Sequence, residues 1–349
     1  MSTSAKIDNF TEKKLNPDIN DIPAEFRHLI PKVAVRTECS LELLNVSQAF
    51  GNAIRRILCS EMKTKCLLFE MDNMTSDDKF ILPDFIQDRI RLIPLLQNIA
   101  ADVVFSLDVV NNNLEMKTIY SSDLKITGGK KMKYFNQNIP ICELNPGSFL
   151  SIKNIFVSED YGYVHGSYCS AQAVVLLPLD EIPINCTHYR NDVPQTRKNA
   201  KFTQSGMSDP RQHLLRFETN GNIESRGLVA KAFKELRNLL QNVQKILSTD
   251  DAIVVSYINN NTTNTTNTNS ANGDNISSLR LNGDSHTVGL LLSKTIHDAK
   301  PDIPSVNYSR DSILREITLQ VRTQGDARDM INNACKYNIE LINHLLKQI

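Results

Sequence analysis

The sequence of 349 residues lacks three features that would each point to a function: an excess of one charge, paired cysteines and a long apolar run. Lys plus Arg and Asp plus Glu each total 39, whereas a protein that itself grips nucleic acid usually has a basic excess. The seven cysteines form no CxxC pair, which is typical of free thiols in a reducing compartment. The N-terminus has no apolar signal core and no run is long enough to span a bilayer, so we expect no membrane association.

A metal site is open to consideration, because five potential ligands could gather in space: Cys66, Cys169, Cys186, His165 and His188. None of them has the paired spacing that is typical of zinc sites. The sequence therefore favours a chain without a metal ion and without another cofactor.

Signatures of catalysis are also missing. The sequence contains no glycine-rich phosphate loop, no GxSxG, no HExxH and no EF-hand-type carboxylate cluster. Ser285–Thr287 reads "SHT", but its place at the start of a predicted helix favours capping over a Ser/His pair. Met207–His213 gathers an aspartate, an arginine and a histidine without a nucleophile, and we interpret it as a structured loop. We expect no catalytic residue in this chain.

Residues 1–30 are polar and aperiodic, which predicts a loose N-terminal tail. The pattern of residues 31–65 then predicts a strand followed by a helix. The strand alternates between apolar and polar residues, and Asn45 or Ser47 can cap the helix. The strand face consists of Val33, Val35, Thr37, Cys39, Leu41 and Leu43. The helix stripe consists of Val46, Phe50, Ala53, Ile54 and Ile57, with Leu58 at its edge.

Arg55 and Arg56 interrupt this helix without belonging to its apolar stripe. At about 100° per residue they fall on the flank and the back of the helix. Spacing alone favours a solvated polar face over contact with a partner.

Residues 66–180 predict a β-rich insertion, since short strands alternate with turns such as Asn145–Gly147. Its last predicted strand reads "AQAVVLLPL". Residues 181–250 then return to the first unit and end in a long helix at 226–247. The apolar seam of that helix consists of Val229, Phe233, Leu236, Leu240, Val243 and Leu247.

Residues 251–349 predict a second α+β unit. Two candidate strands flank an Asn/Thr-rich tract at 260–275, which we expect to be disordered because it cannot bury apolar surface. A helix at 285–299, a strand reading "ILREITLQV" and a final helix follow. The stripe of the final helix consists of Met330, Ile331, Ala334, Leu341, Leu345 and Ile349, with Asn338 as one polar stop. This helix is a suitable mate for the helix at 226–247.

These pieces together resemble the α-like subunits of multisubunit RNA polymerases. "NVSQAFGNAIRRILCSEM" is similar to the first helix of that family, and "DFIQDRIRLIPLL" to its next signature. The segment leading into Gly162–His165 looks like its archaeal and eukaryotic members. "GDSHTVGLLLSKTI", followed by Pro304, Val306 and Tyr308, resembles the partner of that subunit, the archaeal L or eukaryotic eleventh subunit. The overall layout over residues 31–349, including "LEMKTIYSSDL" and "MSDPRQHLL", looks most like the fused subunit of asfarvirus-type polymerases.

The resemblance implies an α+β fold in which two dimerisation units are joined in one chain and the first carries the insertion. It implies a non-catalytic scaffold that docks the large catalytic subunits, mainly the second-largest, together with small subunits. Nucleic acid would be contacted only indirectly. The four-cysteine zinc loop of some members is absent, which again predicts no metal.

In the family, the exposed face of the first helix docks a large subunit, so the resemblance reverses the interpretation of the two arginines. The implied partner interface consists of Asn52, Arg55, Arg56, Arg89 and Pro94. The implied interface between the two halves consists of Phe50, Ile54, Ile57, Val229, Phe233, Leu236, Leu240, Val243, Leu291, Leu341 and Leu345.

The resemblance also implies a viral protein of the host cytoplasm and the virion. The alternative from another functional class is a stand-alone nucleic-acid-binding or transcription-factor module. Zero net charge and the lack of a basic, aromatic stretch disfavour that alternative.

Overall fold

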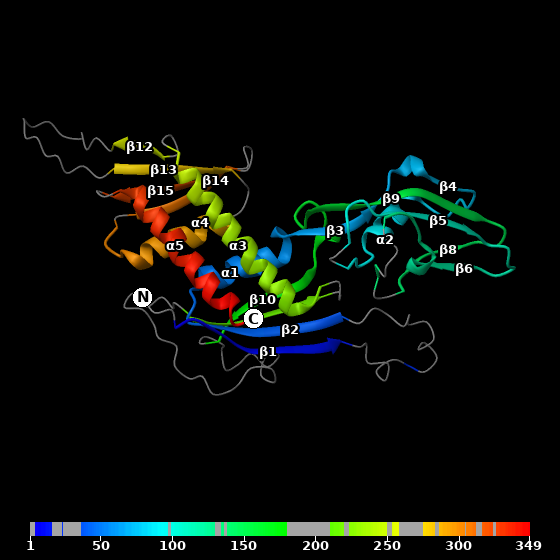
Figure 1. The fold of residues 1–349 in the computed structure, drawn as a ribbon, viewed down its shortest axis with the longest axis horizontal. Coiled ribbons are helices and arrows are strands. Elements are labelled where there is room, and N and C mark those ends of the chain that lie inside the picture. Colours follow the sequence, from blue (N-terminus) through cyan, green and yellow to red (C-terminus); the bar gives the residue numbers. More distant parts are fainter. Residues whose placement is uncertain are drawn as a thin grey trace, which may run out of the picture.

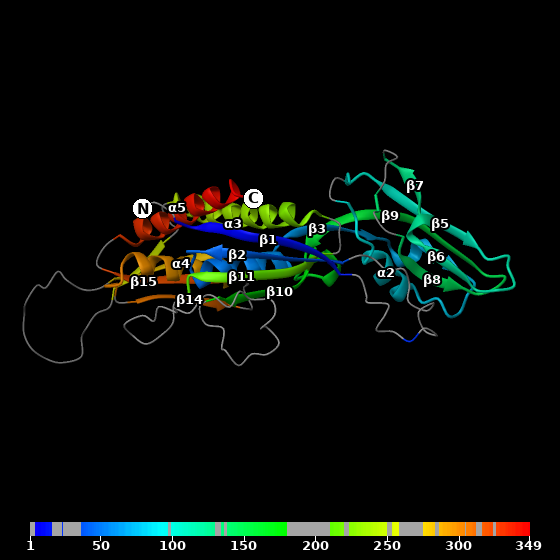
Figure 2. The same ribbon diagram turned by 90° about the horizontal axis from the view of Figure 1, so that it is seen from below.

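The computed structural model is an α+β protein with three main antiparallel sheets, arranged as an elongated molecule (Figures 1 and 2). It describes residues 4–15, 23, 36–96, 99–129, 134–135, 138–179, 210–219, 223–249, 253–257, 275–282, 286–303, 305–311, 316–323 and 326–349. Among these residues, no helix combines the length and the apolarity needed to cross a membrane.

The first sheet has the strand order β1-β2-β11-β10. Its strands are β1 (Lys6–Leu15), β2 (Arg36–Leu44), β10 (Ala171–Pro178) and β11 (Gln212–Thr219). Two helices accompany it, α1 (Gln48–Arg56) and α3 (Ser225–Leu247). Cys39, Leu41 and Leu43 of β2 are fully buried, which confirms the predicted face in the described part of the strand. Val33 and Val35 lie outside the described residues.

The predicted N-terminal tail is wrong for residues 6–15, because they form strand β1 along the edge of this sheet. Ile7 and Phe10 pack against the core, while Lys6, Lys13 and Lys14 are exposed. The pairing register shifts between Asp8 and Thr11, where Asn9 has a positive φ of 47°. This bulge breaks the two-residue period, which is why the segment looks aperiodic in the sequence.

The second sheet has the order β12-β13-β15-β14. Its strands are β12 (Ile253–Tyr257), β13 (Asn275–Asn282), β14 (Ser305–Asp311) and β15 (Glu316–Thr323). Its helices are α4 (His286–Ala299) and α5 (Ala327–Leu346). The Asn/Thr-rich tract lies outside the described residues except for Asn275, which begins β13.

The third sheet belongs to the insertion, which forms the far end of the molecule in Figure 1. Its order is β3-β9-β5-β7, with β4 also paired to β9. These strands are β3 (Lys63–Leu68), β4 (Met74–Ser76), β5 (Val104–Val110), β7 (Lys125–Gly128) and β9 (Phe149–Tyr161). The other elements are α2 (Pro83–Arg91), the two-stranded pair β6 (Lys117–Tyr120) and β8 (Pro140–Leu144), and the 3₁₀ turns Met71–Asn73, Ser121–Asp123 and Gly166–Tyr168. A separate apolar core fills this insertion.

The predicted end of the insertion at residue 180 is wrong. "AQAVVLLPL" forms β10, which pairs with β11 of the first sheet, for example Leu176 opposite Leu215. A continuous apolar run identifies a buried strand but carries no information about which sheet it joins. The described insertion therefore ends before Ala171.

One continuous apolar core joins the first and second sheets. Helix α3 packs against α5, and α1 packs against α4 (Figure 1). The rings of Phe50 and Phe233 stack with centroids 6.2 Å apart and tie α1 to α3. The predicted seam of α3 is buried, and so are Ile331, Leu341 and Leu345 of α5. Every residue expected at the interface between the halves lies in this core.

Candidate partner interface

The helix α1 is held between the first sheet and α4. The Ser47 hydroxyl caps it by accepting a hydrogen bond from the Phe50 N–H at 3.2 Å, one of the two caps expected from the sequence. A Cβ on Gly51 would lie 3.0 Å from Leu176, so the glycine permits the close approach of β10. The predicted apolar stripe is buried, and the two arginines at the end of the helix are half-buried.

After Arg56 the helix widens into a π-helical turn, η3, over Ile57–Glu61. Such turns are rare and shift the side chains that follow them around the helix axis. Ile57 and Leu58 remain fully buried in this turn. Glu61, at its end, is directed back toward Arg56, with an Arg56 Nη2 to Glu61 Oε1 distance of 3.0 Å.

The Nε of Arg55 donates a hydrogen bond to the Oδ1 of Asn52 at 2.8 Å. The two residues are three apart on the helix, so they lie on the same face. The terminal amino groups of Arg55 have no hydrogen-bond partner among the residues that the structure describes. Asn52 therefore orients the guanidinium and leaves its two-pronged end available.

Arg56 is engaged within the chain. Its Nε donates to the Thr287 hydroxyl at 3.0 Å, and its Nη2 donates to Glu61. The Thr287 hydroxyl lies 2.7 Å from Glu61 Oε2 and donates to that carboxylate. These three side chains form a closed polar ring between η3 and the first turn of α4, which we call the Arg56–Glu61–Thr287 ring.

The two neighbouring arginines thus differ, although the resemblance treats them as one pair. Arg55 presents an oriented, available end, while Arg56 links the two halves of the chain. Glu61 is absent from the residues expected at the site. Its spacing of five from Arg56 is not an α-helical neighbour spacing, so only the π-helical turn brings the two together.

Arg89, on α2, also has contacts inside the chain. Its Nη2 donates to the carbonyl oxygen of Pro140 at 3.0 Å, and its guanidinium lies 5.9 Å from the ring centroid of Phe85. These contacts join α2 to the start of β8. A role of Arg89 in binding a partner stays a prediction.

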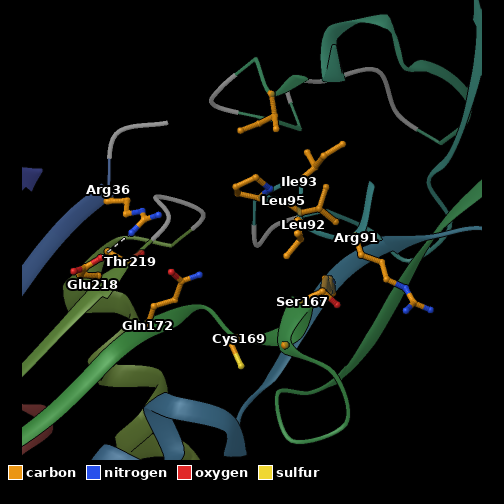
Figure 3. A pocket seen from close by; sticks show the side chains of 14 residues that line it. Arg36, Arg91, Leu92, Ile93, Leu95, Ser167, Cys169, Gln172, Glu218 and Thr219 are labelled. Carbon is orange, nitrogen blue, oxygen red and sulfur yellow. Dashed lines mark hydrogen bonds and ion pairs between the residues drawn. The ribbon is translucent and has the colours of Figure 1, made fainter. Parts of the chain in front are cut away.

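Pro94 lies beside a hollow of about 220 Å³ between the insertion and the first sheet. Figure 3 shows Leu92, Ile93 and Leu95 on one side and the Arg36–Glu218 pair on the other; that pair is 3.5 Å apart. Arg91 points away from the other labelled residues in this view. The hollow therefore has mixed apolar and polar walls, and its cations already have partners nearby, as Arg91 has in Asp88 at 3.7 Å.

Of the five residues considered as metal ligands, the structure brings Cys66 and His165 close to the same side chain, Ser167. The Ser167 hydroxyl lies 3.7 Å from the Cys66 sulfur and 2.9 Å from Nδ1 of His165. Burial raises the pKa of the Cys66 and Cys169 thiols, which favours the protonated form that does not bind metals. Within the described ranges no three His, Cys, Asp or Glu residues are grouped as a metal site, and Cys186 and His188 lie outside those ranges.

The structured-loop interpretation of Met207–His213 is wrong for its last two residues, because β11 begins at Gln212. Arg211, just before that strand, pairs with Asp298 of α4 at 3.3 Å, so the start of β11 lies beside α4. Residues 207–209 and Ser285 lie outside the described residues.

The sequence profile of one family, the RNA polymerase Rpb3/Rpb11 dimerisation domain, matches residues 40–240. The chain is 27% identical over 307 residues to the DNA-directed RNA polymerase RPB3-11 homolog of African swine fever virus (strain Badajoz 1971 Vero-adapted), covering 83% of this chain and 80% of that protein. The homolog of the isolate Pig/Kenya/KEN-50/1950 is 26% identical with the same coverage. The DNA-directed RNA polymerase subunit Rpo3 of Methanocaldococcus jannaschii is 33% identical over 131 residues, 36% of this chain and 62% of that protein.

Proposed function

Because this chain belongs to the RNA polymerase Rpb3/Rpb11 dimerisation-domain family, we propose that it is a non-catalytic scaffold subunit of a viral DNA-directed RNA polymerase. In this role it pairs its own two halves and presents the paired surface to the large catalytic subunits. The similarity to the viral RPB3-11 homologs over 83% of the chain supports this assignment. Viral transcription in the host cytoplasm and packaging in the virion form part of the same proposal.

The repetition of one architecture within the chain is the observation that carries the proposal. The first half runs β1, β2, α1, β10, β11, α3, and the second runs β12, β13, α4, β14, β15, α5. The sheets have matching orders, β1-β2-β11-β10 and β12-β13-β15-β14. Equivalent helices also pack against each other, α1 against α4 and α3 against α5. This supports two dimerisation units joined in one chain, with β3 to β9 inserted in the first.

Joining the units favours their pairing. A covalent linker converts a bimolecular encounter into an intramolecular one, with an effective concentration on the order of mM for a short flexible connection. The shared apolar core then stabilises the pair, and the assembled surface is available for the larger subunits.

Docking rests on the outward part of α1. The oriented guanidinium of Arg55 suits a carboxylate or a carbonyl pair on the second-largest subunit, because its planar fork can bind bidentately. Pro94 and Arg89 lie at the edge of the insertion and extend the proposed surface. Small polymerase subunits are further proposed partners.

The experiment is affinity purification of the tagged full chain from cells that produce the whole polymerase. We expect the large catalytic subunits to co-purify and Arg55→Ala to reduce their recovery at least tenfold, since loss of a central interface arginine can cost about 2 kcal/mol. Lys234→Ala, an exposed charge change on α3, is the matched control. If Arg55→Ala recovers the large subunits at the parental level in high salt, Arg55 is a solvated surface residue and not part of the interface.

The alternative, a stand-alone nucleic-acid-binding module, makes a different prediction for the same material. The purified chain would shift labelled DNA in a salt-dependent manner, and no large subunit would co-purify. That pair of results would overturn the scaffold proposal.

A further inference from the structure

The Arg56–Glu61–Thr287 ring crosses the boundary between two units of the same architecture, which raises the question of how a half distinguishes the other half from a second copy of itself. Apolar surfaces alone discriminate weakly between similar partners. Specificity usually needs a polar or charged element that is satisfied in one pairing and unsatisfied in the alternative.

The ring is well shielded from water. The side chain of Glu61 is 10% exposed, that of Arg56 is 31% exposed, and Thr287 is 2% exposed. Every member uses the other two, because Arg56 donates to both partners and Thr287 donates to Glu61. A carboxylate this buried is costly to leave without its donors.

The first turn of α4 also stabilises the Glu61 carboxylate electrostatically. Thr287 is the second residue of α4, so the Glu61 carboxylate lies beside a helix N-terminus. That end of a helix carries a partial positive charge, which favours an adjacent anion. The second half therefore offers Glu61 both a hydroxyl and a helix end.

The first half lacks the hydroxyl that completes the ring. Helices α1 and α4 each begin three residues before a glycine, Gly51 or Gly289. Counted from these glycines, Ala49 of the first half corresponds to Thr287. Lys294 of the second half corresponds to Arg56, and because the π-helical turn inserts one residue before Glu61, Asp298 is the counterpart of Glu61.

We infer that the Arg56–Glu61–Thr287 ring selects pairing of the first half with the second half over pairing of two first halves. In a pair of first halves, Arg56 and Glu61 would face Ala49, which has no hydroxyl. The second half has its own cation–carboxylate pair near these positions, Lys294 with Asp298 at 2.8 Å, so the ring discriminates against pairs of first halves and not against pairs of second halves. This inference deepens the proposed scaffold function, on which its biological meaning rests.

The test measures partner choice in the full chain without any other subunit. Labelled (¹⁵N) and unlabelled chains are unfolded together in urea, refolded at one concentration and chemically cross-linked. Mass spectrometry of the cross-links then distinguishes pairs of first halves from mixed pairs, whether these form within one chain or between two. The ratio of pairs can be measured whether or not the chain binds polymerase subunits. A negative result for the ring is therefore distinguishable from a negative result for the proposed scaffold function.

The main variant is Thr287→Val, which keeps the shape of the side chain and removes the hydroxyl. We expect the ratio of first–first pairs to mixed pairs to rise roughly tenfold to hundredfold, the range that corresponds to losing a buried hydrogen bond to a charged group. Adding Ala49→Thr, which returns a hydroxyl to the first half, should raise that ratio further. Thr287→Ser should restore the parental ratio.

The matched control is Ser293→Ala, another hydroxyl of α4, which donates within its own helix to the carbonyl oxygen of Leu290 at 3.1 Å. It should leave the ratio unchanged. If Thr287→Val does not refold, Glu61→Gln gives the same test from the first half. Parental ratios in the variants would overturn the inference, and so would the failure of both to refold, because the ring would then be a requirement of folding rather than of partner choice.

Discussion

The seam between α3 and α5 provides the sharpest test of how the two halves depend on each other. Leu240 lies on α3, is fully buried, and belongs to the core shared by both sheets. Leu240→Ala removes three carbon atoms from the side chain at the point where the halves meet. Gln241→Ala, at the next and exposed position of the same helix, is the control.

The expected loss follows from burial. At ~0.8 kcal/mol for each buried methylene-sized group, transfer alone accounts for about 2.4 kcal/mol. The residual cavity adds to this, and buried Leu→Ala changes in well-packed cores cost roughly 2–5 kcal/mol in total. With a denaturant slope near 3 kcal/mol per M urea, the midpoint should fall by about 1 M. Leu240→Asp should be more severe, because it places an unpaired charge in the seam.

The assay is urea unfolding followed by far-UV circular dichroism. The insertion has a separate apolar core, so the parent should show two transitions, one for the insertion and one for the paired halves. Leu240→Ala should lower the midpoint of the second transition only. The two halves should still unfold together in that transition. Equal midpoints for Leu240→Ala and Gln241→Ala would refute the reasoning, and so would separate transitions for the two halves.

Two further predictions concern a glycine and a carboxylate. Gly289→Ala should lower the melting temperature of the second half strongly, because the new Cβ would lie 2.7 Å from the Tyr308 ring. This loss should occur although alanine is the better helix former. Gly166→Ala, which has open space around it, is the control and should change the melting temperature little. Hydrogen bonds from Asn145 and Phe80 hold the pKa of Asp78 below its usual range, so this group contributes stability above about pH 4 that is lost as pH falls through the lowered folded pKa. Asp78→Asn should therefore flatten the acid limb of the insertion's stability profile measured by urea unfolding, and an unchanged slope would contradict it.

Much of the fold is predictable from local patterns, since its helices carry strong apolar stripes. The seams of α3 and α5 and the buried face of α1 follow directly from 3.6-residue spacing. Strand β1 and the sheet membership of β10 are not predictable in this way. A bulge at Asn9 hides the period of the first, and pairing partners far apart in the sequence decide the second.

The arginine pair marks the limit of sequence reasoning about the site. Adjacent residues on a helix differ by about 100°, which separates Arg55 and Arg56 from the stripe but does not reveal the neighbours of either. Those neighbours depend on a π-helical turn that redirects Glu61 and on Thr287, which lies 231 residues away from Arg56 in the chain. Neither feature leaves a local pattern. The same motif "NAIRR" therefore contains Arg55, for which we propose a contact with a partner, and Arg56, which is bonded to Thr287 of α4. A double Arg55→Ala, Arg56→Ala change would affect both at once. Single substitutions separate them, because only the loss of Arg56 breaks the ring.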